Sequence, residues 1–360
     1  MYRRVLALAT SSVLALILLA GCDSGTSSSD NGGTSSALSG GGVEDFSPME
    51  LSLATSYSTT HAFFPYLEEF AQKVSDATNG DITITIYDSN TLVPTADMHN
   101  AVVSGVVDMV ETDVAYDTSA FPISIATYLP NFNATSSKTF TYAFHEFYQN
   151  DFDEFDGMKI LWAYGMTPFA ILSNREITTL EDMSGLSIRA TGAALDAMTA
   201  LGASPVGMPI SETYEAASKG TVEAICNSYE TLKGWNFAEV VKYGLSVSGI
   251  STGNHYIAIN EEVWNSFPAE YQAAIVEISN EMVDKVAGLF DEIDIEGKEF
   301  GEENGVVFSE LSDEEQARWS EALQPIVDDW IADTTALGYD GQQIYDNLVA
   351  LVDKYAQTYG

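Results

Sequence analysis

The sequence predicts an α/β protein with two domains. The stretch from Leu180 to Asn227 alternates short apolar strands with helices in the order strand, helix, strand, helix, strand, which is typical of a parallel sheet. The roughly 310 residues that follow Met49 are enough for two domains with substantial cores. The last part of the chain is predicted to be helical, because its apolar residues recur every three or four positions.

The stretch from Leu180 to Asn227 carries the clearest local pattern. A short alternating strand ends on Arg189, and a helix with apolar residues at every third position from Leu195 follows it. Gly202 ends that helix, and a second helix opens at Ser211. The third strand ends at Asn227. Ligands of parallel sheets bind at the carboxyl ends of the strands, so Arg189 and Asn227 are candidate site residues.

Arg189 is the most informative single residue, because the chain has only 14 lysines and arginines against 53 acids. A guanidinium presents a planar set of donors that pairs with a carboxylate through two hydrogen bonds. Two interpretations follow from the position alone. Arg189 either binds a carboxylate ligand or forms a structural ion pair with one of the many acids.

Four segments of this stretch resemble the solute-binding subunits of tripartite ATP-independent periplasmic (TRAP) transporters: Gly185–Arg189, Ala200–Met208, Ser211–Ala216 and Gly220–Glu223. Their order and spacing match over about 40 residues. The resemblance implies a two-lobed fold like that of periplasmic binding proteins, with a ligand cleft between the lobes. It also implies that Arg189 binds the carboxylate of the substrate.

The N-terminal region predicts export and lipid anchoring. Residues 1–22 combine a positive start with an apolar run too short to be a stable membrane span. Leu19–Cys22 resembles a lipobox, in which Cys22 is acylated, and the alternative is an ordinary cleaved signal peptide. The Ser/Gly-rich residues 23–47 form a flexible linker. We therefore expect an extracytoplasmic protein that a lipid on Cys22 holds at the membrane.

The resemblance extends over nearly all of the remaining chain. The first elements are a strand at Met49–Ala54, a helix at Phe63–Ala77 and a strand at Ile82–Ile86. A short helix at Asp97–Ser104 and a strand at Val106–Val110 come next, and TRAP subunits show the same order. The folded part, residues 48–360, would divide into lobe I (48–166 and part of 253–300) and lobe II (167–252 and the C-terminal helices).

The resemblance also implies which residues face the cleft: Arg189, Asn227, Phe169, Tyr57, Asp113, Tyr229, Trp235, Tyr116 and Ser56. Asp113 would accept a hydrogen bond from a polar group of the substrate, or it is a solvated loop acid. Phe169 stands where sialic-acid binders of the family place a second arginine. This departure favours a smaller or more apolar monocarboxylate: a keto, hydroxy or aromatic acid.

Helices dominate the C-terminal third. Apolar residues from Tyr271 to Ile293 step by three and four, which predicts one long helix that begins at Pro268. In the family such a helix braces both lobes. Two further helices are predicted at Ser312–Val327 and Gln342–Tyr355. Their apolar stripes indicate packing, or docking to the membrane subunits.

The net charge of −39 makes nucleic acids and anionic membrane surfaces poor partners. The acids form a solvated surface, and an adaptation to high salt is one hypothesis. Equal stability at low and high NaCl would exclude it. With Cys22 acylated, Cys226 has no cysteine partner and is expected to be a core residue rather than a nucleophile.

No motif of an enzyme, cofactor or metal site is present, and the four histidines are scattered. We therefore expect no cofactor, no metal and no catalytic residue. The sequence predicts a TRAP solute-binding protein that delivers a small organic carboxylate to a permease driven by an ion gradient. The alternatives are an extracytoplasmic hydrolase and a binding protein that serves a sensor.

Overall fold

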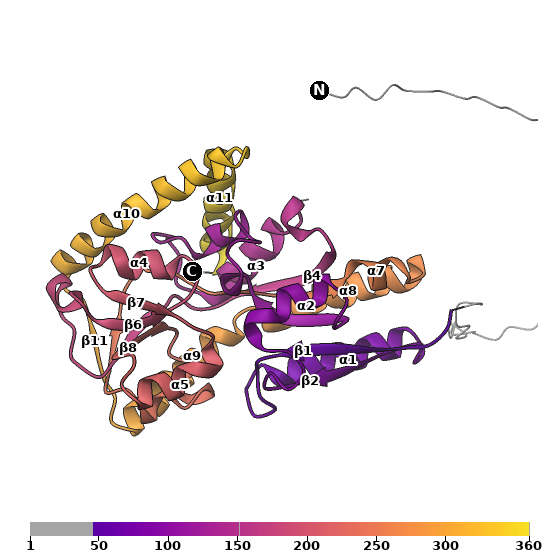
Figure 1. Ribbon diagram of the computed structural model, residues 1–360, viewed down its shortest axis with the longest axis horizontal. Helices are drawn as coiled ribbons and strands as arrows, with labels where there is room; N and C mark the ends of the chain where they lie inside the picture. Colours follow the sequence, from indigo (N-terminus) through magenta and orange to yellow (C-terminus); the bar gives the residue numbers. More distant parts are fainter. Residues whose placement is uncertain (1–45, 151, 360) are drawn as a thin grey trace, which may run out of the picture. The chain divides into compact units, whose positions relative to one another are not determined.

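The computed structural model describes residues 46–150 and 152–359, which contain two β-sheets (Figure 1). The first sheet has the strand order β2-β1-β3-β10-β4. Its strands β1, β2 and β3 are parallel, whereas β10 runs antiparallel to β3 and β4 on either side. The bounds are β1 (Met49–Thr55), β2 (Ile82–Tyr87), β3 (Met109–Asp113), β4 (Met158–Gly165) and β10 (Asn254–Asn260).

The second sheet has the order β11-β9-β5-β8-β6-β7. Its strands are β5 (Ala170–Ser173), β6 (Ser187–Ala190), β7 (Ser204–Gly207), β8 (Ala224–Asn227), β9 (Tyr243–Ser246) and β11 (Val307–Glu310). β6 is parallel to both β7 and β8, and α4 (Ala194–Ala200) and α5 (Ile210–Ser218) connect these strands. The predicted strand–helix–strand–helix–strand unit is therefore confirmed.

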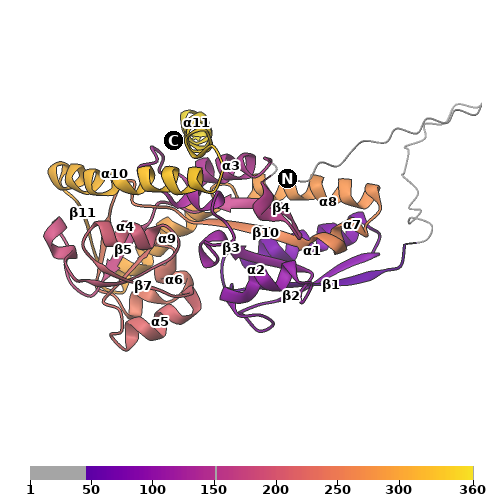
Figure 2. The same cartoon turned by 45° about the horizontal axis from the view of Figure 1, so that its top comes forward.

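The remaining helices pack around the two sheets, as Figures 1 and 2 show. They are α1 (Phe64–Ala77), α2 (Met98–Val103), α3 (Ser137–Phe147), α6 (Thr231–Gly234), α7 (Glu261–Asn265), α8 (Ala269–Val286), α9 (Leu289–Glu303), α10 (Asp313–Ala336) and α11 (Gly341–Tyr359). None of the helices in the described ranges is both long enough and apolar enough to cross a bilayer.

The predicted single helix from Pro268 to Ile293 is wrong, because it is interrupted between α8 and α9. Ala287 is extended and Gly288 is left-handed, with φ of 91°. The interruption turns Asp291 toward the start of α3, where its carboxylate accepts hydrogen bonds from Ser137 N (2.6 Å) and Ser136 Oγ (2.8 Å). The apolar spacing continues across Gly288, so periodicity alone does not reveal the break.

The bracing role is shared among several helices. α8 packs on α1 and β4 of the first sheet, whereas α9 packs on α6 beside the second sheet. The 24-residue α10 lies over α4 (Figure 2). The indole N–H of Trp330 in α10 donates to the carbonyl of Pro122 at 3.0 Å. The two-lobed α/β class is confirmed, with α8 and α9 in place of one continuous helix.

β3 begins three residues later than the predicted strand at Val106–Val110. Gly105 is left-handed, and Val106 N donates to Ala101 O at 2.9 Å, so the start of that segment is a turn. Val106 is 72% exposed. The strand instead includes Glu111 and ends on Asp113, both of them buried. Two acidic side chains thus enter the interior at the edge of the site.

Both sheets contribute to one apolar core, in which residues of β3 and the turns after it meet residues around β6 and α4. Gly192, just after β6, lies where the two regions come close together. A Cβ there would lie 2.9 Å from the Cβ of Ala115 and from Ile125 Cδ1. The predicted targeting segment, Cys22 and most of the linker lie outside the described residues. The lobe boundaries stay a prediction.

Candidate functional site

One cavity is lined by residues from elements of both sheets. It encloses about 380 Å³ of space free of protein atoms, including its opening to solvent. Eight of the nine predicted ligand-binding residues line it: Ser56, Tyr57, Asp113, Tyr116, Phe169, Arg189, Asn227 and Trp235. The remaining lining residues, which the sequence did not indicate, are Tyr128, Met166, Thr191, Ile210, Glu230 and His255.

Arg189 lies on β6 and is only 1% exposed. Its Nε donates to the carbonyl of Met208 at 3.1 Å. Within the described chain, no carboxylate oxygen lies within 4.0 Å of this guanidinium, whereas the exposed Arg318 pairs with Glu181 and Glu315. A buried charge without a counter-charge is costly, so the arrangement suits an anionic ligand.

Asn227 ends β8, the strand next to β6. Because Arg189 pairs with Ile225 across the parallel ladder, Asn227 lies two residues further toward the carboxyl edge. Its Oδ1 accepts from Ser228 N at 2.8 Å, and its Nδ2 makes no hydrogen bond to another described residue. We call Arg189 and Asn227 the donor wall, because both present N–H groups without an anionic partner.

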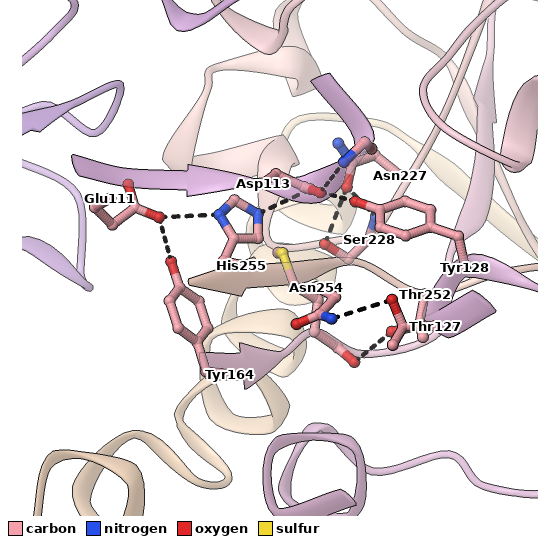
Figure 3. A network of polar contacts seen from close by, with 12 residues as sticks. Glu111, Asp113, Thr127, Tyr128, Tyr164, Asn227, Ser228, Thr252, Asn254 and His255 are labelled. Carbon is pink, nitrogen blue, oxygen red and sulfur yellow. Dashed lines mark hydrogen bonds and ion pairs between the residues drawn. The ribbon is translucent and has the colours of Figure 1, made fainter. Parts of the chain in front are cut away.

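Opposite elements supply a chain of hydrogen bonds that we call the acid network: Tyr164, Glu111, His255, Asp113 and Tyr128 (Figure 3). Glu111 Oε1 accepts from the Tyr164 hydroxyl at 2.8 Å and lies 3.0 Å from His255 Nδ1. His255 Nε2 lies 3.4 Å from Asp113 Oδ2, which also accepts from the Tyr128 hydroxyl. Every member therefore has partners inside the protein.

The acid network shifts the titration of its own members. Burial raises the pKa of Asp113, although the charge of His255 and hydrogen bonds from Tyr128 and Ala115 oppose this. For His255, burial disfavours the charged form, but Asp113 and Glu111 outweigh it and raise its pKa. His255 therefore holds its proton more strongly than a free imidazole does, with a carboxylate near each ring nitrogen.

Glu230 follows β8 and lines the cavity while being 3% exposed. Its Oε2 lies 3.2 Å from Nε2 of His61, which comes from the loop after β1. Its backbone N–H donates to Asp294 Oδ1 at 2.9 Å. Gly234 makes the pair possible, because a Cβ there would lie 2.7 Å from Glu230 Oε2 and 2.8 Å from His61 Nε2.

Aromatic rings form much of the remaining lining. The centroid of the Tyr57 ring lies 4.3 Å from that of His61 and 6.2 Å from that of Trp235. The rings of Phe169 and Tyr128 meet edge-on, with their centroids 6.0 Å apart. The Trp235 Nε1 is buried and has no hydrogen-bond partner in the described residues. The cavity therefore combines apolar faces with a few donors and acceptors, as small-molecule sites do.

One predicted ligand residue, Tyr229, lies outside the cavity, whereas Cys226 lies in the core as expected. Tyr229 does not line this cavity, because its hydroxyl is 2.8 Å from Ser246 Oγ and its ring meets Phe308 edge-on. We leave it out of the ligand set proposed below. Cys226 is fully buried, and burial raises the pKa of its thiol to about 12, which fits a core residue.

His255 and Glu230 line the cavity but are not among the predicted ligand residues, and both are missed for the same reason. His255 reaches the site because β10 inserts between β3 and β4, where His255 faces Asp113 on one side and Tyr164 on the other. This pairing joins residues that are far apart in the sequence, and no local sequence pattern predicts it. For Glu230, the partner His61 is 169 positions away.

Comparisons with known sequences agree with this architecture. The family model of bacterial extracellular solute-binding proteins, family 7, matches residues 53–333. A C4-dicarboxylate-binding periplasmic protein of Rhodobacter capsulatus is 30% identical over 165 residues, which cover 45% of this chain and 49% of the relative. The match thus spans about half of that relative. A solute-binding protein of Roseobacter denitrificans is 24% identical, covering 78% of this chain and 90% of its own.

Solved structures show the same fold. A TRAP periplasmic solute-binding protein from Desulfovibrio salexigens has a TM-score of 0.75 and 26% identity, and covers 87% of this chain and 98% of its own. A marine metagenome TRAP protein in complex with 3-hydroxybenzoate has a TM-score of 0.80 and 24% identity, with 86% and 99% covered. The chain belongs to family 7 of the bacterial extracellular solute-binding proteins, the solute receptors of TRAP transporters.

Proposed function

We propose that the cavity binds a small organic monocarboxylate, with Arg189 as the group that holds the acid. The observation that carries the proposal is the buried guanidinium without a carboxylate partner in the described chain. A ligand carboxylate would supply the missing counter-charge and form charge-assisted hydrogen bonds with it. Such hydrogen bonds contribute about 1.5–3 kcal/mol.

Asn227 would donate its free amide N–H either to the same carboxylate or to a neighbouring keto or hydroxyl oxygen. The ring of Phe169 and the indole of Trp235 would cover the body of the ligand. Tyr116 lies beside Arg189. Burial raises the pKa of its hydroxyl to about 12, against the opposing charge of Arg189, so the hydroxyl stays protonated. Closure around the ligand would exclude water and strengthen the ion pair.

The lining favours one carboxylate over two. Arg189 is its only lysine or arginine, and Asp113 and Glu230 would repel a second ligand carboxylate. Relatives of both kinds exist: the Rhodobacter protein is named for C4-dicarboxylates, and a Nostoc protein for monocarboxylate 2-oxoacids. Structural neighbours hold mandelate and benzoate. Asp113 and Glu230 in the lining of this cavity support the monocarboxylate class.

The family description is that of extracellular solute-binding proteins, and the TRAP name of the solved neighbours supports a membrane permease as the partner. We propose that this chain is acylated on Cys22, stays at the membrane and hands its ligand to TRAP permease subunits without catalysing a reaction. The lipobox-like Leu19–Cys22 segment supports the anchor. Metabolic labelling with a palmitate analogue tests it: Cys22→Ala should abolish the label, and a label that persists would contradict the anchor.

Thermal unfolding against a panel of organic acids tests the binding proposal. A ligand at 100 times its dissociation constant should add about 2.7 kcal/mol of stability. The panel should contain keto, hydroxy, amino, aromatic and dicarboxylic acids, and the protein should be unfolded and refolded first to remove any co-purified ligand. A shift that Arg189→Ala removes would support the proposal. No shift with any carboxylate would contradict it.

A further inference from the structure

Building on the proposed function, we infer that the ligand is zwitterionic, with a protonated nitrogen in addition to its carboxylate. Arg189 would hold the carboxylate, and Glu230 together with Asp113 would face the nitrogen. The inference rests on the charges around the cavity, on the free acceptor positions of two buried carboxylates, and on the aromatic lining.

Glu230 has an unused acceptor. Its Oε2 lies 3.2 Å from His61, whereas no hydrogen bond in the described chain reaches its Oε1. The side chain is almost entirely shielded from solvent, yet it lines the cavity. A carboxylate oxygen in that position suits a ligand group that donates hydrogen bonds and carries positive charge.

Asp113 adds a second acceptor. Its Oδ2 accepts from the Tyr128 hydroxyl and lies near His255, whereas Oδ1 accepts only from Ala115 N at 2.8 Å. Since a carboxylate oxygen accepts up to two hydrogen bonds, Oδ1 retains capacity for a ligand N–H.

The charges around the cavity leave an excess of acid once a carboxylate has bound. Arg189 is then neutralised by the ligand, and His255 is matched by Glu111 behind it. Asp113 and Glu230 remain. Glu230 has one contact with His61, through Oε2 at 3.2 Å, and its backbone N–H donates to a further acid, Asp294. A cationic group on the ligand would offset part of this excess, whereas a second carboxylate would add to it.

Aromatic faces point to the same ligand class. Five aromatic residues line the cavity: Tyr57, Tyr116, Tyr128, Phe169 and Trp235. The face of an aromatic ring attracts an ammonium group within about 6 Å, and the attraction is stronger when water is excluded. A plain hydrophobic acid would use the rings but not the two carboxylates. A zwitterion would use both.

Matched ligand sets test the inference by calorimetry on the purified protein. The sets share a skeleton and differ at one atom: alanine, lactate and pyruvate; phenylglycine, mandelate and phenylglyoxylate; proline and tetrahydrofuran-2-carboxylate. In every set that binds, the nitrogen-bearing member should bind about tenfold or more tightly than its oxygen counterparts.

The outcomes separate the two proposals. If oxygen-bearing acids bind through Arg189 as tightly as their nitrogen counterparts, or more tightly, the zwitterion inference is wrong and the proposed function stands. The same holds if other carboxylates of the panel bind while no amine-bearing acid does. If no carboxylate binds at all, both proposals fail.

Two variants locate the nitrogen subsite. Glu230→Gln should lower the ratio of nitrogen to oxygen affinities about fivefold or more, and Asp113→Asn should lower it less. Glu239→Gln is the matched control, because this acid is exposed and lies outside the cavity. If Glu230→Gln weakens both members of a pair equally, Glu230 only holds the His61 contact, and the subsite is refuted. If the Glu230→Gln variant does not fold, the Asp113→Asn variant and the order of ligand affinities for the wild-type protein still test the inference.

Discussion

The donor wall and the acid network face the same cavity but are built in opposite ways. Arg189 and Asn227 keep N–H groups without an anionic partner, whereas Glu111 receives hydrogen bonds from Tyr164 and Thr55 (2.6 Å) and lies beside His255. A polar group that the protein does not satisfy is left for a ligand, and a satisfied one holds the structure in place. The contrast assigns binding mainly to one wall and stability mainly to the other.

The largest expected effect comes from breaking the acid network at its centre. His255→Phe keeps a flat ring but removes the cation between Glu111 and Asp113, so two buried acids would face each other. Breaking a buried ion pair by removing one partner costs about 3–5 kcal/mol. Urea denaturation at neutral pH should therefore show a loss of about 3 kcal/mol.

His99→Phe is the matched control for that variant. His99 is half-buried, and its ring packs against Phe121 without an ion pair. Its substitution should change the free energy of unfolding by less than about 1 kcal/mol. Similar losses for the two variants would show that the acid network contributes no special stability.

On the donor wall, Arg189→Ala should act on binding instead. Removing a charge-assisted pair of about 1.5–3 kcal/mol should weaken ligand binding at least about tenfold in calorimetry. The ligand-free variant should unfold at the same temperature as the wild type or a higher one, because a buried charge without a counter-charge is removed.

Arg318→Ala controls for the loss of an arginine, since the Arg318 side chain is 39% exposed and pairs with Glu181 and Glu315, none of which lines the cavity. It should leave the affinity unchanged. If the Arg189→Ala variant is less stable without ligand and still binds the ligand normally, Arg189 stabilises the fold and does not bind the ligand, which would contradict the role given to the donor wall.

The same contrast separates what the sequence predicts from what it does not. Arg189 and Asn227 belong to one contiguous unit whose glycines, helix ends and strand ends are all local signals. The acid network joins β3, β4 and β10. The position of its central residue, His255, is set by pairing with strands that lie far away in the sequence. The spacing of apolar residues within β10 does not predict that this strand runs antiparallel to β3 and β4.

Local patterns also failed where polar residues interrupt them. The predicted strand at Val106–Val110 ends too early because Glu111 and Asp113 break the apolar run, although both are buried. The helix after Pro268 was predicted as continuous because Val286, Leu289 and Ile293 keep helical spacing through a left-handed Gly288. In both places hydrogen bonds of acidic side chains, those of Glu111 and Asp113 in β3 and of Asp291 in α9, accompany a departure from the structure that the apolar spacing predicts.

The pH dependence of stability should test the acid network together with two buried acids outside it, Glu154 and Asp294. The pKa of Asp113 and that of His255 are both raised in the folded protein, and burial raises those of Glu154 and Asp294 to about 7. The folded state then binds more protons than the unfolded one, so stability falls as pH rises. Between pH 5 and pH 8, Glu154 and Asp294 should each contribute a loss of about 2–3 kcal/mol.

Burial lowers the pKa values of His99 and His145, which contribute in the opposite direction near pH 6.5. Urea denaturation at fixed salt and four pH values measures the sum. Glu154→Gln should flatten the slope, whereas Arg189→Ala should leave it unchanged. A stability that rises from pH 5 to pH 8 would contradict the protonation assigned to the network.

The smallest expected effect concerns the second member of the donor wall. Asn227→Ala removes one neutral donor, worth about 1 kcal/mol, so ligand affinity should fall about fivefold in calorimetry. The exposed Asn100 provides the control, and Asn100→Ala should leave the affinity unchanged. A loss as large as that of Arg189→Ala would mean that the amide and the guanidinium bind the same carboxylate as a coupled unit. No loss would restrict the donor wall to Arg189, with Asn227 reduced to the turn that its Oδ1 forms with Ser228.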